Sequence, residues 1–378
     1  MAELGKVVTG KTPKTAIPEN YGGDIPFLTP SDDMSVKYVS ATAKTLSEKG
    51  VAEVKNALLP PDSVCVSCIG SDLGKVVITT ENTVTNQQIN SIIVDKEHFD
   101  VSFIYYAMLI LGKKLNFISK TSTAVPIVNK SSFSSYEIMC PSLEQQKTIA
   151  VILSSLDSKI ECNREINDNL QQQAAALFSS LYDRTNTEVR FTDLIQILGG
   201  GTPKTGENTY WNGNIAFFTP KDVGTPYTLS TEKTITEEGL SHCNSRLYPV
   251  NTVFVTARGT VGKVGMSGVP MAMNQSCYAL VGKETHQLLV YFYTLKTVDR
   301  LKHKASGAVF DAITTRDFES EQIMKLSDED AKSFLCIAAP MFQKVLDNGI
   351  ENQRLSTLRD SLLPKLMSGE IDVSAVQL

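Results

Sequence analysis

Hydrophobic and polar residues are distributed along this chain in two different textures. In the first texture, short apolar runs such as 64–67, 75–79 and 253–256 lie between glycine- and proline-containing turns, which predicts strands. Two longer apolar runs, 103–111 and 288–295, predict short buried helices, although periodicity alone does not separate a buried helix from a buried strand. The second texture contains few turn residues and is typical of long helices.

The clearest helical segment extends from residue 142 to residue 181, without glycine or proline. Ser142 and Gln145 have the spacing of a capping box, which predicts the start of the helix. Residues at alternating intervals of four and three form a predicted coiled-coil seam of about four heptads: Ile149, Leu153, Leu156, Ile160, Asn163, Asn167, Leu170, Ala174, Leu177 and Leu181. Asn163 and Asn167 would trade stability for register, so replacing both with leucine should stabilise the helices. The alternative is one long helix packed on a globular core.

A second helical segment, 327–370, repeats the first less regularly. Its predicted seam comprises Leu346, Ile350, Leu355 and Leu362, and Gly369 is suited to end the helix. Pro340 interrupts the pattern. Because an interior proline removes a backbone hydrogen bond, it predicts a break or a 3₁₀ step in this helix.

The rest of the chain contains an internal sequence repeat. The segment Gly-Lys-Thr-Pro-Lys-Thr at 10–15 returns as Gly-Gly-Thr-Pro-Lys-Thr at 200–205, and residues 23–32 return at 213–222 with the same offset of 190. A period of this length indicates a duplicated domain rather than a solenoid repeat. We therefore predict an α+β fold with two duplicated globular α/β domains, separated by a long antiparallel two-helix coiled coil and related by a pseudo-twofold.

The textures and the repeat together predict the boundaries of these parts. They are 1–140 for the first globular domain, 141–183 for the central helix, 184–326 for the second domain, 327–370 for the closing helix and 371–378 for a frayed tail. Such a protein would bind its target with two similar domains that are held apart by helices.

Bulk composition limits the possible function classes. The chain has 378 residues and a net charge of −5, and no apolar run approaches the length of a membrane-spanning helix. It shows no secretory signal, so its seven scattered cysteines predict reduced thiols and a cytoplasmic location. The acidic charge argues mildly against a nucleic-acid partner, so such a function must depend on local clusters of lysine and arginine.

Local clusters of this kind occur in and beside the repeated segments. There, basic residues lie next to glycine turns and hydroxyl groups, a combination that suits contacts with DNA phosphates. The candidate DNA-binding residues are Lys11, Thr12, Lys14, Lys75, Thr202, Lys204, Lys221, Arg258 and Lys263. A solvated surface position is the alternative for each lysine, and a plain hairpin turn is the alternative for the glycine loop 70–75. We interpret Tyr21 and Trp211 as turn or core packing.

The sequence shows no catalytic or metal-binding constellation. Cys65 and Cys68 have no second pair at metal-ligand spacing, so we interpret them as buried strand thiols. The four histidines are not clustered with acidic residues at ligand spacing, and the loop ending at Lys75 lacks the spacing of a P-loop. We therefore expect no metal site, no bound cofactor and no catalysis by this chain alone.

Several motifs, in their order along the chain, resemble the specificity subunit of type I restriction–modification systems. They are the two Thr-Pro-Lys-Thr segments with their followers Ile-Pro-Phe-Leu-Thr-Pro-Ser-Asp (25–32) and Ile-Ala-Phe-Phe-Thr-Pro-Lys-Asp (215–222), the helix entry Pro-Ser-Leu-Glu-Gln-Gln-Lys-Thr-Ile (141–149) and the closing Leu-Leu-Pro-Lys-Leu-Met-Ser-Gly-Glu-Ile (362–371). The resemblance covers nearly the whole chain.

The resemblance implies a non-catalytic DNA-recognition subunit. Two target-recognition domains would each read one half of an asymmetric, bipartite double-stranded DNA target, and the helices would fix the spacing and dock two DNA-adenine methyltransferase subunits. S-adenosylmethionine, ATP and Mg would be bound by these and by the restriction subunits. Base readout would lie where the copies differ, roughly 33–60 and 95–130 against 223–250 and 282–320.

Two other functions remain open at this point. A two-headed scaffold whose globular domains bind other proteins fits the acidic net charge equally well. An enzyme that uses the glycine loop would need to bind nucleotide as an isolated chain. Strongly salt-dependent affinity for DNA would separate the DNA reader from the scaffold.

Overall fold

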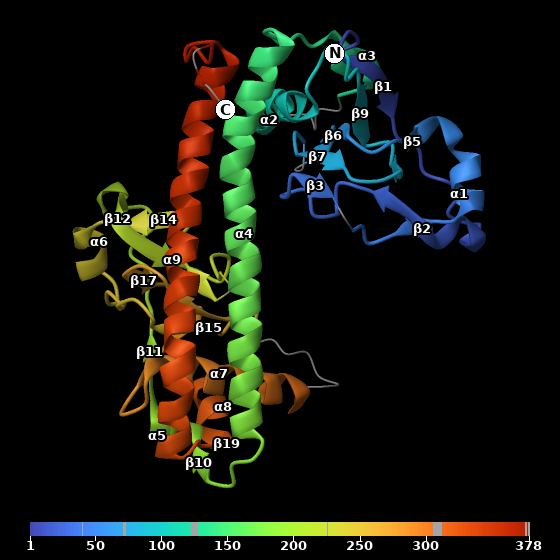
Figure 1. The fold of residues 1–378 in the computed structure, drawn as a ribbon. Coiled ribbons are helices and arrows are strands. Elements are labelled where there is room, and N and C mark those ends of the chain that lie inside the picture. Colours follow the sequence, from blue (N-terminus) through green and yellow to red (C-terminus); the bar gives the residue numbers. More distant parts are fainter. Residues whose placement is uncertain are drawn as a thin grey trace. The chain divides into compact units, whose positions relative to one another are not determined.

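The computed structural model describes residues 1–39, 41–70, 73–121, 128–224, 226–304, 312–374 and 376, without the side chains of 118–121. The chain forms two compact units, one made of Met1–Ile160 with Arg354–Leu378 and the other of Glu161–Gln353. Each unit combines strands and short helices with part of two long helices, α4 (Leu143–Tyr182) and α9 (Asp328–Met367) (Figure 1). The predicted α+β class is confirmed.

The first unit contains two sheets. The five-stranded sheet has the order β1-β9-β6-β7-β3, in which only the β3–β7 pair is parallel. Its strands are β1 (Gly5–Thr9), β3 (Tyr38–Val39), β6 (Ser63–Ser67), β7 (Val76–Thr79) and β9 (Ile89–Val94). The four-stranded sheet, β4-β2-β8-β5, is formed by β2 (Tyr21–Leu28), β4 (Thr45–Leu46), β5 (Leu58–Leu59) and β8 (Thr83–Thr85). The strands predicted at 64–67 and 75–79 are confirmed.

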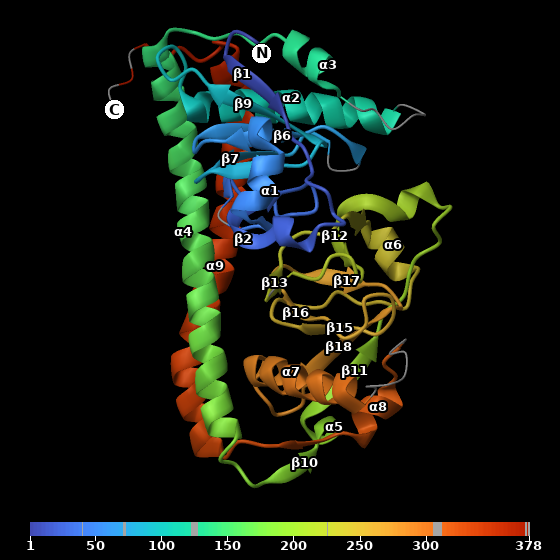
Figure 2. The same cartoon turned by 90° about the vertical axis from the view of Figure 1, so that its right-hand side faces the viewer.

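One long helix covers the five-stranded sheet of this unit. This helix, α2 (Val101–Thr121), confirms the helix predicted at 103–111 and lies against β6 and β7 (Figure 2). Phe103 and Tyr106 of α2 are fully buried with Val64 and Leu153, so the core joins the sheet, α2 and α4. The short helices are η1 (Pro18–Asn20), α1 (Glu48–Glu53), η2 (Lys55–Ala57) and α3 (Lys130–Ser135).

The second unit repeats this topology. Its five-stranded sheet, β11-β18-β15-β16-β13, has the same order and again only one parallel pair, β13–β16. The strands are β11 (Ile195–Gly199), β13 (Tyr227–Thr228), β15 (Val253–Thr256), β16 (Val264–Ser267) and β18 (Cys277–Gly282). A helix equivalent to α2, α7 (Gln287–Lys304), packs on this sheet and confirms the helix predicted at 288–295. The duplication seen in the sequence is therefore a duplication of fold.

The remaining elements of the second unit complete the correspondence. The sheet β14-β12-β17 is formed by β12 (Trp211–Phe218), β14 (Lys233–Ile235) and β17 (Met271–Met273), with a parallel β12–β17 pair that matches β2–β8. The smaller elements are β10 (Glu188–Arg190) paired with β19 (Gln322–Met324), α5 (Phe191–Leu194), η4 (Asn208–Tyr210), α6 (Glu237–Ser241) and α8 (Thr315–Ser320). None of the helices in the described residues combines the length and apolar character that crossing a bilayer requires.

The helix α4 starts as the sequence predicts. The backbone N–H of Gln145 donates to Ser142 Oγ at 3.4 Å, and the N–H of Ser142 donates to Gln145 Oε1 at 3.3 Å, so the capping box is confirmed. Within each unit α4 and α9 run antiparallel: Asp157 contacts Arg359 in the first unit, and Asn167 contacts Asn348 in the second.

The predicted break at Pro340 is wrong, because α9 continues without interruption through this residue. Pro340 is exposed, and so is Cys336, whose carbonyl loses its helical hydrogen bond and is left to water. On the opposite side of the same helical stretch, Phe334 and Ala338 are fully buried and hold the helix against its neighbours. The helix ends at Met367, and Gly369 just beyond it adopts a left-handed φ of 76° as expected for a cap.

The predicted seam residues all face inward to some degree. The buried members are Ile149, Leu153, Ile160, Asn163, Ala174, Leu181 and Leu346. The half-buried members are Leu156, Asn167, Leu170, Leu177, Ile350, Leu355 and Leu362. Of the tail predicted at 371–378, Val373 is buried in the core of the first unit, whereas Ala375, Gln377 and Leu378 lie outside the described residues.

Candidate nucleic-acid interface

The repeated Thr-Pro-x-Asp segment forms the same hydrogen-bonded turn in both units. In the second unit, Asp222 Oδ2 accepts from the backbone N–H and the hydroxyl of Thr219, at 2.8 and 2.6 Å, and Oδ1 accepts from the N–H of Glu232 at 2.7 Å. In the first unit, Asp32 accepts the equivalent bonds from Thr29, at 2.7 and 2.9 Å, and from the N–H of residue 43, at 2.7 Å. Each aspartate therefore ties two loops together, which is a structural role.

The repeated Gly-x-Thr-Pro-Lys-Thr turn is also held identically in both units. Thr12 Oγ1 donates to Gln87 Oε1 at 2.6 Å, and Thr202 Oγ1 donates to Gln275 Oε1 at 2.5 Å. The lysines of these turns, Lys11, Lys14 and Lys204, are exposed. The turns therefore present threonine–glutamine pairs beside exposed ammonium groups, a donor-rich surface suited to phosphate.

The aromatic residues beside these turns have a packing role, as predicted. Tyr21 Oη donates to the carbonyl of Pro13 at 3.0 Å, and Trp211 Nε1 donates to the carbonyl of Lys204 at 3.1 Å. Each aromatic ring therefore fixes the turn rather than extending towards a ligand.

The glycine loops are hairpin turns, a geometry that both of their interpretations share. The first joins the antiparallel strands β6 and β7, and the second joins β15 and β16. Gly74 and Gly262 have φ values of 89° and 75°, a conformation that favours glycine. A Cβ on Gly74 would lie 2.2 Å from the carbonyl oxygen of Gly112, so the hairpin packs tightly on α2. Lys75 and Lys263 are exposed at the ends of these hairpins; residues 71 and 72 of the first loop lie outside the described residues.

Only some of the predicted DNA-binding residues of the second unit come together. Lys221 and Arg258 line one hollow, and Lys204, Lys263 and Thr202 are not part of its lining. The lining consists of Thr219, Pro220, Lys221, Glu232, Lys233, Arg258, Gly259, Thr260, Asn274 and Ser276. We call it the basic hollow. Its hydroxyl, amide and cationic groups can donate to phosphate oxygens and to base edges.

The thiols and one histidine cluster are the other groups with possible chemistry. Cys65 is fully buried in β6, and burial raises the pKa of its thiol to about 12, so the interpretation as a buried thiol is confirmed. The expectation that no histidine clusters with acidic residues is wrong for His98, whose Nδ1 lies 2.8 Å from Asp95 Oδ2, with Glu97 beside them. This hydrogen bond raises the pKa of His98 and lowers that of Asp95. The three residues lie in one exposed turn, and the hydrogen bond between His98 and Asp95 stabilises that turn.

Alanine at Lys11 or Lys204 is expected to weaken DNA binding to the same extent for every sequence, because a lysine that contacts phosphate carries no sequence information. The slope of log K against log salt should fall by about 1 for each phosphate that is no longer neutralised. Binding titrations over a salt series measure both quantities. Lys365→Ala, which removes an exposed lysine of α9 paired with Glu370, is the control. Unchanged affinity and slope would identify Lys11 and Lys204 as ordinary surface residues.

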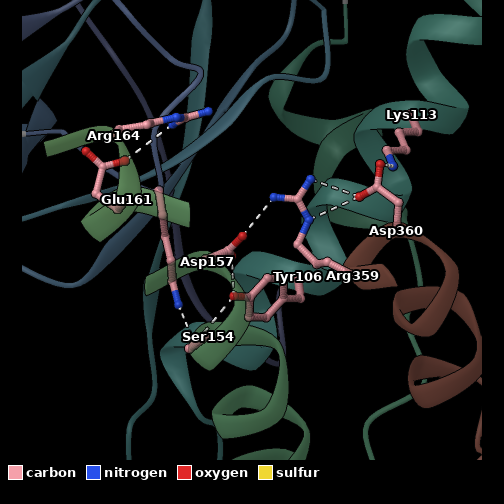
Figure 3. Close-up of polar contacts among 9 residues, drawn as sticks. Tyr106, Lys113, Ser154, Asp157, Glu161, Arg164, Arg359 and Asp360 are labelled. Atoms are coloured by element: carbon pink, nitrogen blue, oxygen red, sulfur yellow. Dashed lines mark hydrogen bonds and ion pairs between the residues drawn. The ribbon is translucent and has the colours of Figure 1, made fainter. Parts of the chain in front are cut away.

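Charged groups attach α2 to the long helices in the first unit (Figure 3). Tyr106 Oη of α2 donates to Asp157 Oδ2 of α4 at 2.5 Å, and Arg359 of α9 donates to Asp157 Oδ1 at 2.7 Å. Asp360 of α9 accepts from Arg359 at 3.0 Å and lies 3.2 Å from Lys113 Nζ of α2. These contacts fix the helical face of the first domain to α4 and α9.

A half-buried lysine next to the strand β3 extends this attachment. Lys37 Nζ donates to Ser102 Oγ at 3.0 Å and to Ser154 Oγ at 2.7 Å, and it lies 5.5 Å from the ring of Tyr105 and 4.8 Å from that of Tyr106. Burial lowers the pKa of Lys37 to about 8. The ammonium group is thus held by hydroxyl groups and by ring faces.

In the second unit the attachment is aromatic instead. Phe178 of α4 is fully buried, with its ring centroid 4.9 Å from that of Phe292 and 5.5 Å from those of Tyr293 and Phe334. Phe178 lies one position beyond the predicted seam residue Leu177, which is only half-buried. The two domains therefore use different chemistry to pack on the same pair of helices.

A layer of buried and half-buried asparagines connects α4 and α9 within the second unit. Asn163 Nδ2 donates to Glu351 Oε2 at 2.8 Å and to Asn352 Oδ1 at 2.9 Å. Asn348, which is fully buried, donates to Asn167 Oδ1 at 2.8 Å, and Asn167 donates to the carbonyl of residue 345 at 3.2 Å. Each of these asparagine side chains therefore relies on the opposite helix for a hydrogen-bond partner.

Replacing Asn167 alone with leucine is expected to destabilise the protein, in contrast to the expectation from the seam pattern. The buried amide of Asn348 would be left without its acceptor, at a cost of about 1–3 kcal/mol. The double variant Asn167→Leu/Asn348→Leu removes both partners and should recover most of this loss. Urea unfolding of the three proteins measures the difference. A single variant more stable than the parent would support the simpler seam argument instead.

Comparison with known proteins places the duplicated fold. The sequence matches the family described as "Type I restriction modification DNA specificity domain" over residues 1–172 and again over 184–327. The chain belongs to this family. The MjaIX specificity subunit of Methanocaldococcus jannaschii is 25% identical over 402 residues, which covers 98% of this chain and 92% of that protein. The HindI specificity subunit of Haemophilus influenzae is 35% identical over 179 residues, or 45% of this chain and 39% of that protein.

A solved structure agrees with the family assignment at the level of the fold. The crystal structure of the type I restriction–modification S subunit from M. genitalium aligns with a TM-score of 0.58 over 97% of this chain and 94% of that chain, at 16% identity. The chain is therefore a type I specificity subunit with two target-recognition domains and a role in DNA sequence recognition.

Several residues of the recognition domains and of α9 were not identified from the sequence. Gln87 and Gln275 belong to a repeated Asn-Gln pair, and the repetition was the available signal for their role. Lys233 lies beside the predicted Lys221 in the basic hollow but outside the quoted repeats. Asn348 gives no signal of its own, since its importance depends on Asn167 of the other helix.

Proposed function

We propose that this specificity subunit reads an asymmetric, bipartite double-stranded DNA target, with one half-site for each recognition domain. The observation that carries this proposal is that one backbone frame, fixed by the same hydrogen bonds at Asp32 and Asp222, carries different side chains in its two copies. Two similar frames with different side chains suit two half-sites of different sequence. The repeated turns would contact phosphates in both halves.

The long helices would set the distance between the half-sites and dock two DNA-adenine methyltransferase subunits. Two uninterrupted helices of 40 residues each support a role as a spacer. Exposed apolar side chains on them, including Val151, Ile166, Ile337 and Leu358, support a role in docking.

Catalysis would belong to the partner subunits in this assembly. Methyl transfer would use S-adenosylmethionine bound by the methyltransferase, and restriction would use ATP and Mg bound by the restriction subunits. This chain would hold none of these cofactors, would not be an enzyme by itself, and would act in the cytoplasm, where the target DNA lies.

DNA binding over a salt series tests the proposal against the two-headed scaffold. The purified chain, alone and with its methyltransferase, would be titrated with duplexes that contain or lack the target. We expect affinity to fall steeply with salt for both duplexes and to remain higher for the target throughout. If the chain bound neither duplex at any salt concentration, alone or with its methyltransferase, a protein-binding scaffold would be favoured.

A further inference from the structure

The duplication allows the lining of the basic hollow to be compared with the first domain position by position. Three pairs of equivalent hydrogen bonds fix the alignment. The bond from Ala257 N–H to the Ser276 carbonyl, at 2.8 Å, matches that from Cys68 to Gln88, also at 2.8 Å. The bonds to Asp222 and Asp32 align residue 232 with residue 43. The side chains of Asn274 and Asn86 accept equivalent bonds, both at 3.0 Å.

This alignment separates the lining into a constant part and a variable part. The constant positions are Thr219, Pro220, Lys233, Gly259 and Asn274, which correspond to Thr29, Pro30, Lys44, Gly70 and Asn86. At a sixth position, Thr260 corresponds to the similar Ser71. The variable positions are Lys221, Glu232, Arg258 and Ser276, which correspond to Ser31, Ala43, Ile69 and Gln88. Four of the ten lining residues of this hollow therefore differ between the two domains.

The most radical of these differences is at position 258. The backbone of Arg258 is fixed, because its N–H donates to the Ser276 carbonyl at 3.2 Å and the residue forms a β-bridge with Ala312. Its side chain is exposed and makes no hydrogen bond or ion pair with any residue that the structure describes. The equivalent Ile69 has no polar group at all.

The neighbouring cations are engaged differently from Arg258. Lys221 Nζ lies 3.9 Å from Glu232 Oε2, and Lys233 Nζ lies 5.6 Å from the centre of the Trp211 ring. Among the described residues, Arg258 therefore offers a guanidinium without a partner on a fixed backbone, between groups suited to hold phosphate. A guanidinium in this state can donate two parallel bonds to the O6 and N7 acceptors of guanine, which is the most common specific contact of arginine with DNA.

We propose that the four variable positions of the hollow form a base-reading set, and that Arg258 reads a guanine in the half-site of the second domain. The inference rests on the proposed function and assigns base readout to positions 221, 232, 258 and 276, three of which lie outside the segments where the two copies differ most. The first domain, with Ile69 at the equivalent position, does not read guanine there. The constant positions would contact DNA without sequence preference.

The test is to map adenine methylation by the complete methyltransferase complex containing R258I, which installs the side chain of the first domain. We expect the first half-site to be unchanged and one guanine of the second half-site to become degenerate, with a loss of discrimination of about 5- to 150-fold. The control is Arg184→Ile, which removes the same charge from an exposed arginine paired with Asp330 in the same unit. That variant should retain the parental motif.

The outcomes separate this inference from the proposed function. A parental motif that R258I leaves unchanged would overturn the assignment of Arg258 alone, as would a partial loss of methylation that is equal at all sites. If R258I abolishes methylation, R258K is tested in its place. Lysine keeps the positive charge but lacks the two-pronged geometry of the guanidinium. R258K should then methylate with weaker discrimination of guanine, and full discrimination by it would overturn the inference. A parental complex without any bipartite motif would instead contradict the proposed function.

Discussion

Replacing Phe178 with alanine is expected to lower the free energy of unfolding by about 3–5 kcal/mol, the usual range for a fully buried phenylalanine. Its ring is in contact with Phe292 of α7 and Phe334 of α9, so the substitution leaves a cavity where α4, α7 and α9 meet. Surrounding aromatic rings are too rigid to close such a cavity without further loss. Urea unfolding of the full chain, followed by circular dichroism, measures the change.

Leu177→Ala is the matched control for this prediction. Leu177 is the adjacent residue, belongs to the seam predicted from the sequence and is only half-buried. Its truncation should cost clearly less than that of Phe178. If Leu177→Ala proved the more damaging of the two, the regular seam would describe the packing of α4 better than the aromatic cluster does.

Replacing Asp222 with alanine is expected to destabilise the second domain by about 2–4 kcal/mol, because the substitution removes the acceptor of three hydrogen bonds, two of which are partly buried. These bonds hold Thr219 and the N–H of Glu232, both of which line the basic hollow. The variant should therefore also lose discrimination in the second half-site while the first is still read. Thermal unfolding and methylation mapping measure the two effects separately.

Asp222→Asn provides the control, since an amide oxygen can still accept part of this set of bonds. It should lie between the parent and Asp222→Ala in stability. Asp32→Ala makes the equivalent change in the first domain and is expected to affect the other half-site. Loss of discrimination in both half-sites from either single change would show that the two domains do not read DNA independently.

Local sequence patterns predicted much of this fold. The capping box at Ser142, the uninterrupted helix behind it, the hairpin strands and the left-handed cap at Gly369 each depend on residues close together in the chain. The duplication extended these predictions, because a motif such as Thr-Pro-x-Asp is informative when it appears twice. The sequence therefore predicted that the two domains share one backbone frame. It did not predict the hydrogen bonds that Asp32 and Asp222 accept.

The features that were missed depend on residues far apart in sequence. Phe178 is more deeply buried than Leu177 because it packs against rings from α7 and α9. The heptad pattern of α4 contains no information about these partners. The effect of Pro340 depends on which face of α9 is exposed. Arg258 and Lys221 were identified as basic residues, but only the fold shows that both line one hollow.

The central claim is that this chain determines which DNA sequence is methylated. Mapping adenine methylation in cells that express the chain with its methyltransferase tests it most directly. We expect an asymmetric, bipartite motif that disappears when this chain is deleted, and exchange of residues 1–140 should change one half-site only. Methylation that persists unchanged after deletion of the chain would contradict the claim.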